Sequence, residues 1–284
     1  MTTARSAYHG ARAARVRRRE LFVWLACILL ANQIFRIPAA SLTGLAEALL
    51  PSLMGKSIFY YLGWYAVISL LLESDREVHA SGVDIAFALF VAVLNFLPAA
   101  SVTWISATVL AGFLLATSRG DRTIKAAAVV MLALAFNGLW APAFFEMLAI
   151  YLLRADAALV GTLLSFTQPG MTWHDTIVGR PDGHSLFIYS PCSSFHNISL
   201  GLLCWVTVSK LFRAAWVRAD IMVAAGVSAA VIFLNASRLY LMALSPEYFA
   251  YWHDGFGEVI FAWTTTFTVL LISLWGVLRL GRET

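Results

Sequence analysis

The stretch from residue 220 to residue 243 reads DIMVAAGVSAAVIFLNASRLYLMA and is almost entirely apolar. Counted from Arg218 at its basic start, about 20 helical residues at about 1.5 Å each carry the chain roughly 30 Å to Arg238. That distance matches the hydrocarbon core of a bilayer, so the stretch predicts a membrane-spanning helix. Arg238 then lies at the far boundary, and Asn235, three residues earlier, shares its helical face.

The composition extends this prediction to the whole chain. Hydrophobic residues make up 60% of the 284 residues and charged residues only 13%, whereas soluble domains average about 45–50% and about 25%. We therefore predict an all-α polytopic membrane protein with about eight transmembrane helices, which form a single integral membrane domain over residues 1–284. The predicted spans are 21–36, 57–74, 83–99, 102–117, 126–152, 195–212, 220–243 and 257–278. Two shorter segments, 39–54 and 157–167, are typical of interfacial helices.

The basic residues predict the orientation of these spans. With the N-terminus in the cytoplasm, the outer loops hold only five of the 20 Lys and Arg residues, namely Arg36, Lys56, Arg154, Arg180 and Arg238. Cytoplasmic loops of membrane proteins are enriched in these residues, so we expect both termini to be cytoplasmic, with residues 1–20 as a basic lead. The net charge of +4 is then a signal of topology, and we expect no nucleic-acid partner.

The longest predicted outer loop, residues 153–194, carries a candidate nucleophile. Residues 176–189 predict a small β-hairpin that turns at Pro181-Asp182-Gly183, because proline presets φ and glycine accepts a positive φ. The returning strand leads to Cys192 at the start of the sixth span. Unpaired N–H groups and the helix dipole would favour a thiolate there and would stabilise an oxyanion. The local sequence also fits a cysteine that only packs at the membrane interface.

The other two cysteines, Cys27 and Cys204, fall inside apolar spans. Their positions indicate inert packing residues, and the odd cysteine count argues against a disulfide framework. The sequence contains neither HExxH nor CxxC, and its histidines are not spaced as metal ligands usually are. We therefore expect no metal site and no cofactor.

Two histidines are candidate acid–base groups. His253 precedes the last span and follows a loop that the sequence predicts to be short, which puts it near Arg238. Imidazole is the usual proton shuttle near neutral pH. His196, one helical turn after Cys192, is a rival base that would point deeper into the lipid zone. Simpler readings stay open: His253 as a hydrogen-bonded bystander, and Arg238 as a snorkelling arginine at a helix end.

In order, spacing and topology, these motifs resemble the exosortase/archaeosortase family of membrane cysteine transpeptidases. The matching residues, spread over about 170–260, are Cys192-Ser193-Ser194 at a helix start, Asn235 to Arg238 as Asn-x-x-Arg, and His253 with Gly255 and Gly257. We take this region as the active-site half. The family usually has Cys-Ser-Gly, so Ser194 is a departure that affects the local backbone and the subgroup but removes no reactive group.

The resemblance implies roles for these residues. Cys192 would be the nucleophile of a cysteine-type protease or transpeptidase, His253 its acid or base, and Arg238 a transition-state or substrate anchor. The supporting residues would be Asn235, Ser193 and Ser194.

The resemblance also implies a substrate class and a location. Substrates would be secreted proteins that end in a short motif, a transmembrane helix and a basic tail, and the acyl group would pass to water or to a cell-envelope acceptor. The enzyme would lie in the bacterial inner membrane, with its site facing the periplasm. Two rival readings remain: a transporter or exopolysaccharide-assembly component that uses Arg238 as an anion anchor, and an inactive scaffold.

Overall fold

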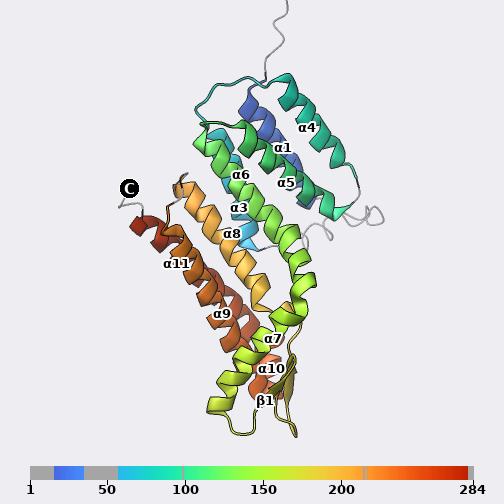
Figure 1. Ribbon diagram of the computed structural model, residues 1–284, viewed down its shortest axis with the longest axis vertical. Coiled ribbons are helices and arrows are strands. Elements are labelled where there is room, and N and C mark those ends of the chain that lie inside the picture. Colours follow the sequence, from blue (N-terminus) through green and yellow to red (C-terminus); the bar gives the residue numbers. More distant parts are fainter. Residues whose placement is uncertain (1–15, 35–56, 98, 214, 216, 281–284) are drawn as a thin grey trace, which may run out of the picture.

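The computed structural model describes residues 16–34, 57–97, 99–213, 215 and 217–280. The predicted interfacial helix 39–54 and the first part of the basic lead lie outside the described residues. Helices dominate the described chain (Figure 1). Their bounds are α1 Arg18–Ile34, α3 Ile58–Leu72, α4 Gly82–Leu94, α5 Ala100–Thr117, α6 Arg122–Ala135, α7 Ala141–Thr167, α8 Ser194–Phe212, α9 Asp220–Leu244, α10 Pro246–His253 and α11 Phe256–Leu280.

Two of the three apolar cores in the described chain lie between helices alone, and the third also includes the sheet. Helices α1, α3, α4, α5 and α6 bury one core, in which Phe22, Trp64 and Met131 are at most 1% exposed. A second core lies between α8, α9 and α11 and includes Val227 and Val269. The first five helices gather at the upper end of the view in Figure 1, and the C-terminal helices lie beside and below them.

One continuous helical segment connects the two ends of the molecule. Residues Arg122–Thr167 form 46 helical residues, roughly 70 Å at about 1.5 Å each, which is more than twice a bilayer core. The prediction of a separate interfacial helix over 157–167 is therefore wrong, because this segment is the end of α7. The sequence shows a polar break at residues 154–156 but no glycine or proline to stop the helix.

A π-helical turn, Phe136–Trp140, interrupts this segment between α6 and α7. Pro142 lacks the N–H that would bond the carbonyl four residues back, so the ordinary helical ladder is broken there. The ring of Trp104 from α5 packs against the same turn, where a Cβ on Gly138 would lie 2.2 Å from it. The segment changes direction between α6 and α7 in Figure 1.

The predicted outer loop is shorter than expected and is largely a sheet. Strands β1 Thr172–His174, β2 Ile177–Gly179 and β3 Ser185–Phe187 form an antiparallel sheet in the order β1-β2-β3. The predicted hairpin corresponds to β2 and β3, where Val178 pairs with Leu186 and both are buried. The sequence did not predict β1, which packs against α7 and extends the hairpin to three strands.

The membrane-spanning character is clear, but the number of spans is not fixed at eight. Within the part of the chain that the structure describes, four segments are long and apolar enough to cross a bilayer, including α8, α9 and most of α11, and three shorter apolar helices accompany them. Helix α4 has 13 residues, or roughly 20 Å, which falls short of a core of about 30 Å. The predicted span 83–99 is therefore too long for the helix that is present.

Candidate functional site

Cys192 lies in a tight turn between the sheet and α8. The 3₁₀ turn Ser190–Cys192 follows β3, and the Cys192 amide donates to the Tyr189 carbonyl at 2.8 Å. The side chain is only 3% exposed and packs in an apolar cluster with α7, the sheet and α9. The sulfur therefore sits at the junction of three elements rather than in a mobile loop.

The surroundings of Cys192 raise the pKa of its thiol, chiefly because burial disfavours the thiolate. The positive charge of Arg238 opposes this shift, and the negative charge of Asp156 adds to it. The expectation of a thiolate stabilised by the helix N-terminus is therefore wrong. Helix α8 begins at Ser194, and its first amides already donate to the carboxylate of Asp156 and to the hydroxyl of Ser193.

The alkylation rate of Cys192 is therefore expected to keep rising at pH values at which an ordinary cysteine is already ionised. In a protein carrying Cys27→Ala and Cys204→Ala, the rate with iodoacetamide follows the thiolate fraction. Arg238→Gln removes a charge that favours the thiolate, so the rate profile should move to higher pH, whereas Asp156→Asn should move it to lower pH. Superimposable profiles for the parent and both variants would contradict this electrostatic account.

A buried polar network fixes the backbone on both sides of Cys192. Asn235 of α9 donates from Nδ2 to the Cys192 carbonyl at 2.9 Å and to Ser194 Oγ at 3.0 Å. Ser194 in turn donates from its hydroxyl to Asp156 Oδ1 at 2.7 Å. Ser194, where the resembled family usually has glycine, thus links α7 to α9. This network also explains how a buried asparagine is satisfied inside an apolar helix.

The sequence reasoning missed Asp156. Its carboxylate is 8% exposed and accepts two hydrogen bonds from the first residue of α8. An unpaired carboxylate in an apolar stretch costs free energy. The position of Asp156 between apolar residues could therefore have indicated that it has a partner. The sequence analysis placed Asp156 in the outer loop 153–194, where a solvated carboxylate needs no partner.

Arg238 lies inside α9 rather than at its end. The helix continues to Leu244, close to the predicted end of this span at residue 243. Its Nε donates to the Trp252 carbonyl at 2.9 Å, and its guanidinium lies 4.9 Å from the centre of the Phe261 ring. Arg238 therefore connects α9 to the end of α10 and to the first turns of α11, immediately beside His253.

Arg238→Lys is expected to be nearly as damaging as Arg238→Ala in any activity that depends on this site. A lysine carries the charge but has no Nε–H to bind the Trp252 carbonyl and no planar group to lie over Phe261. The measurement is the rate of substrate processing for both variants at equal membrane abundance. Near-normal activity of the lysine variant would limit Arg238 to a charge effect and remove its proposed orienting role.

His253 is the last residue of α10, a helix that the sequence analysis took for a short loop. Its Nδ1 lies 2.7 Å from Asp254 Oδ1, and its Nε2 lies 2.9 Å from the Tyr189 hydroxyl. The ring also stacks on Phe249, with 4.7 Å between ring centres. Both imidazole nitrogens are thus engaged, and one of them contacts the residue that begins the Cys192 turn.

Tyr189 is the second residue that the sequence reasoning missed. Its carbonyl accepts the Cys192 amide and its hydroxyl meets His253. It therefore joins the nucleophile candidate to the acid–base candidate across 64 positions in the chain. Nothing in the local sequence marks Tyr189, because its partner comes from a distant helix.

The glycines after His253 serve close packing. A Cβ on Gly255 would lie 2.8 Å from the Tyr251 carbonyl oxygen, and one on Gly257 would lie 2.8 Å from the Trp252 ring. Neither glycine has a positive φ. They let α11 start directly against α10, which holds Trp252 and His253 in place.

Two cavities flank the Cys192 turn and share Pro191 as a wall. We call the first the Arg238 cavity; it measures about 570 Å³ between α3, α8 and α11 and is lined by Arg238, Asn197 and Glu258 among others. The second, the His196 cavity, measures about 510 Å³ and is lined by His196 and Glu146. His196 thus lines the cavity that excludes Arg238, whereas His253 lines neither cavity.

The structure thus connects each of the other predicted site residues to Cys192 or to the residues beside it. Asn235 and Ser194 hold the backbone at Cys192, Ser193 caps α8, and Arg238 acts on the sulfur electrostatically. His253 reaches the same turn through Tyr189.

Comparison with known proteins adds a family. The model of the transmembrane exosortase family matches residues 52–271, which is most of the chain and includes every predicted site residue. Neither the curated proteins nor the solved structures give a match. With its apolar helices, the chain is a multi-pass membrane protein, and it belongs to the transmembrane exosortase family.

Proposed function

We propose that this protein is a membrane-embedded cysteine transpeptidase or protease that cleaves the C-terminal sorting signal of secreted proteins on the outer face of the membrane. The observation that carries the proposal is the arrangement around Cys192. A buried thiol lies within the field of Arg238, its carbonyl is fixed by Asn235, and its turn contacts the imidazole of His253 through Tyr189. Family membership supports the choice of thiol chemistry.

The proposed reaction proceeds through a thioester. In this step His253 Nε2 exchanges its hydrogen bond with the Tyr189 hydroxyl for one with the Cys192 thiol and takes the thiol proton, and the sulfur attacks the scissile carbonyl. Arg238 stabilises the resulting oxyanion, and collapse breaks the C–N bond while His253 protonates the leaving amine. The acyl group then remains on sulfur until water or an amine of an envelope acceptor attacks it and releases the thiol.

The raised pKa of Cys192 fits this order of events. A thiol that stays protonated at neutral pH needs a base in the attacking step, and a buried site supplies the low dielectric in which Arg238 acts strongly. Tyr189 and Asp254 act as positioning residues, because they hold the two nitrogens of the His253 ring.

The Arg238 cavity is our candidate for the substrate entrance. It reaches from Pro191 at the Cys192 turn to exposed apolar side chains such as Ile58 and Trp263. A substrate that ends in a transmembrane helix would arrive through lipid, so an entrance bordered by apolar helix surface suits it. Arg238 and Asn197 would meet the polar backbone of the motif just before that helix.

The test is a co-expression assay with a secreted reporter that ends in a short motif, an apolar helix and a basic tail. The proposal predicts a shortened reporter that has lost its basic tail, released only when this protein is present. The transporter reading predicts an uncut reporter together with altered export of an anionic solute. An uncut reporter for every motif tried would contradict the proposed cleavage.

A further inference from the structure

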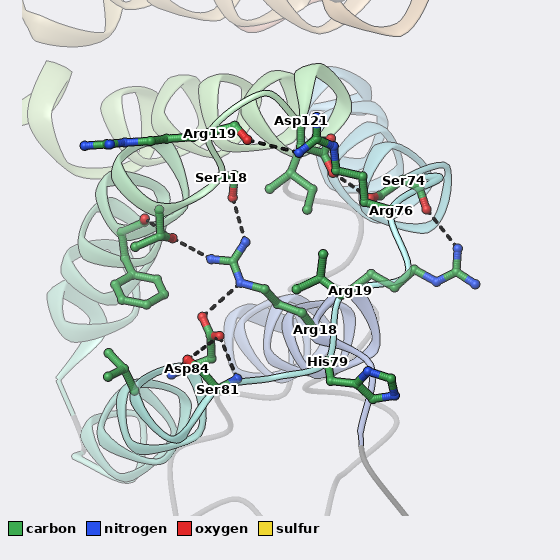
Figure 2. Close-up of a pocket in the computed structure, with 15 residues that line it drawn as sticks. Arg18, Arg19, Ser74, Arg76, His79, Ser81, Asp84, Ser118, Arg119 and Asp121 are labelled. Atoms are coloured by element: carbon green, nitrogen blue, oxygen red, sulfur yellow. Dashed lines mark hydrogen bonds and ion pairs between the residues drawn. The ribbon is translucent and has the colours of Figure 1, made fainter.

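A second basic site lies at the end of the helix bundle opposite to the sheet. It is a pocket of about 330 Å³ between the first turn of α1, the α3–α4 loop and the α5–α6 turn. We call it the arginine pocket, after Arg18, Arg19 and Arg76, which line it. Figure 2 shows Arg18 near the centre of the view and Arg76 above it, while Arg119 extends away to the left.

Arg18 forms the fixed base of the arginine pocket. The residue is 8% exposed, and its Nε donates to Asp84 Oδ1 at 2.9 Å. Its two terminal nitrogens donate to the hydroxyls of Ser118 and Thr117. These bonds take three of the five N–H groups of a guanidinium. The group is thus held rigidly, and its charge is balanced by one carboxylate.

Arg19 and Arg76 are held by neutral groups instead. Arg19 Nη1 donates to the Ser74 carbonyl at 2.9 Å, and Arg76 Nη1 donates to the Arg119 carbonyl at 3.3 Å. Among the described residues, the ion pairs at this end involve Arg17 and Arg18, and none involves Arg19 or Arg76. Both guanidiniums therefore bring positive charge that forms no ion pair with a carboxylate of the described chain.

Gly120 allows Arg76 to take this position. A Cβ on Gly120 would lie 2.8 Å from Arg76 Nη2, and the backbone there has a φ of +79°. The guanidinium thus rests on the α5–α6 turn, at a residue whose positive φ favours glycine. This close approach fixes a charged group at the mouth of the pocket, although the residue itself is exposed.

Among the residues that line the pocket, positive charges outnumber carboxylates. The pocket is lined by two carboxylates, Asp84 and Asp121, against Arg18, Arg19, Arg76 and Arg119. Asp84 is paired with Arg18, and Asp121 accepts bonds from Ser74 and from the first turn of α6. The pocket therefore favours an anion.

The wall of the pocket toward α4 is apolar and faces outward. Val78 is 50% exposed and Val83 is 68% exposed. Val83 begins a row of exposed apolar side chains along α4 that continues through Leu89 and Val93. In a membrane protein such a face contacts acyl chains, so the pocket lies where a lipid headgroup would meet the surface.

We propose that the arginine pocket binds the phosphate headgroup of an anionic phospholipid, whose acyl chains lie along α4. Arginine binds phosphate through two parallel charge-assisted hydrogen bonds, and Arg19 and Arg76 each retain donors for this purpose. A zwitterionic lipid carries the same phosphate, but its choline cation would be repelled by the excess positive charge. The choice of lipid is therefore a test of the electrostatics.

The experiment uses purified full-length protein, delipidated in detergent and titrated with phosphatidylglycerol or phosphatidylcholine of identical acyl chains. Native mass spectrometry measures the bound lipid. We expect phosphatidylglycerol to bind about tenfold more tightly, and the double variant Arg19→Gln/Arg76→Gln to lose about that factor. The matched control is Arg122→Gln. This variant removes a positive charge from the first residue of α6, which follows the α5–α6 turn but does not line the pocket.

The result that would overturn the proposal is equal binding of the two lipids, or unchanged phosphatidylglycerol binding by a double variant with normal thermal stability. An added arm titrates inorganic phosphate. Displacement of phosphatidylglycerol by millimolar phosphate would assign the pocket to a free anion and overturn the lipid assignment. The reporter assay reads the distant Cys192 site, so failure of either proposal leaves the other intact.

Discussion

Cys192→Ala and Cys192→Ser should both abolish processing of the reporter while leaving membrane insertion intact. The alanine variant lacks a nucleophile. The serine variant places a hydroxyl, whose pKa lies far above that of a thiol, in a buried site that already raises the pKa of the native sulfur. The measurement is the fraction of reporter cleaved at equal enzyme abundance.

Cys204→Ala is the matched control for this loss. Cys204 is also fully buried and free, but it lies within α8 in the core formed with α9 and α11. Its variant should retain near-normal processing. Substantial cleavage by Cys192→Ala would make Cys192 structural and would favour the transporter or scaffold reading.

His253→Ala should lower the processing rate by about 10²–10⁴-fold, the usual contribution of general acid–base catalysis. The reason is position: the imidazole contacts the Cys192 turn through Tyr189 and lies beside the Trp252 carbonyl that Arg238 binds. The loss should appear mainly in the chemical step, measured in a single turnover with enzyme in excess over reporter.

His196→Ala should lose much less. His196 lines the cavity on the other side of Pro191, together with Glu146 rather than with Arg238. The informative outcome is therefore the order of the two effects. If His196 is essential and His253 is dispensable, the Cys192–Arg238–His253 assignment is wrong, and the mechanism must be rebuilt around the His196 cavity.

Much of the fold was predictable because apolar helices leave a strong signal in composition and length. The stretch at 220–243 corresponds to α9, and the span predicted at 195–212 corresponds to α8. The signal fails where a helix continues beyond the predicted span, as in α7, and where a loop folds into a short helix, as in α10. Both errors concern where a helix ends, which depends on packing against elements distant in sequence.

The site was predictable in its residue types but not in its connections. Cys192, Asn235, Arg238 and His253 were recognisable as polar groups at the ends of apolar runs. Asp156 was missed because its partner lies 38 residues away at the start of α8. Tyr189 was missed for a similar reason. The pKa of Cys192 was predicted in the wrong direction, because the sequence shows a helix start but not which groups already bind its amides.

The most direct test of the central claim is to intercept the acyl intermediate with hydroxylamine during reporter cleavage. A thioester on Cys192 reacts with this amine, so the account predicts that the shortened reporter ends in a hydroxamate, identified by mass spectrometry of its C-terminal peptide. The Cys192→Ala variant should give neither product. Efficient cleavage that yields only a free carboxylate, whatever the hydroxylamine concentration, would contradict a thioester and with it the proposed role of Cys192.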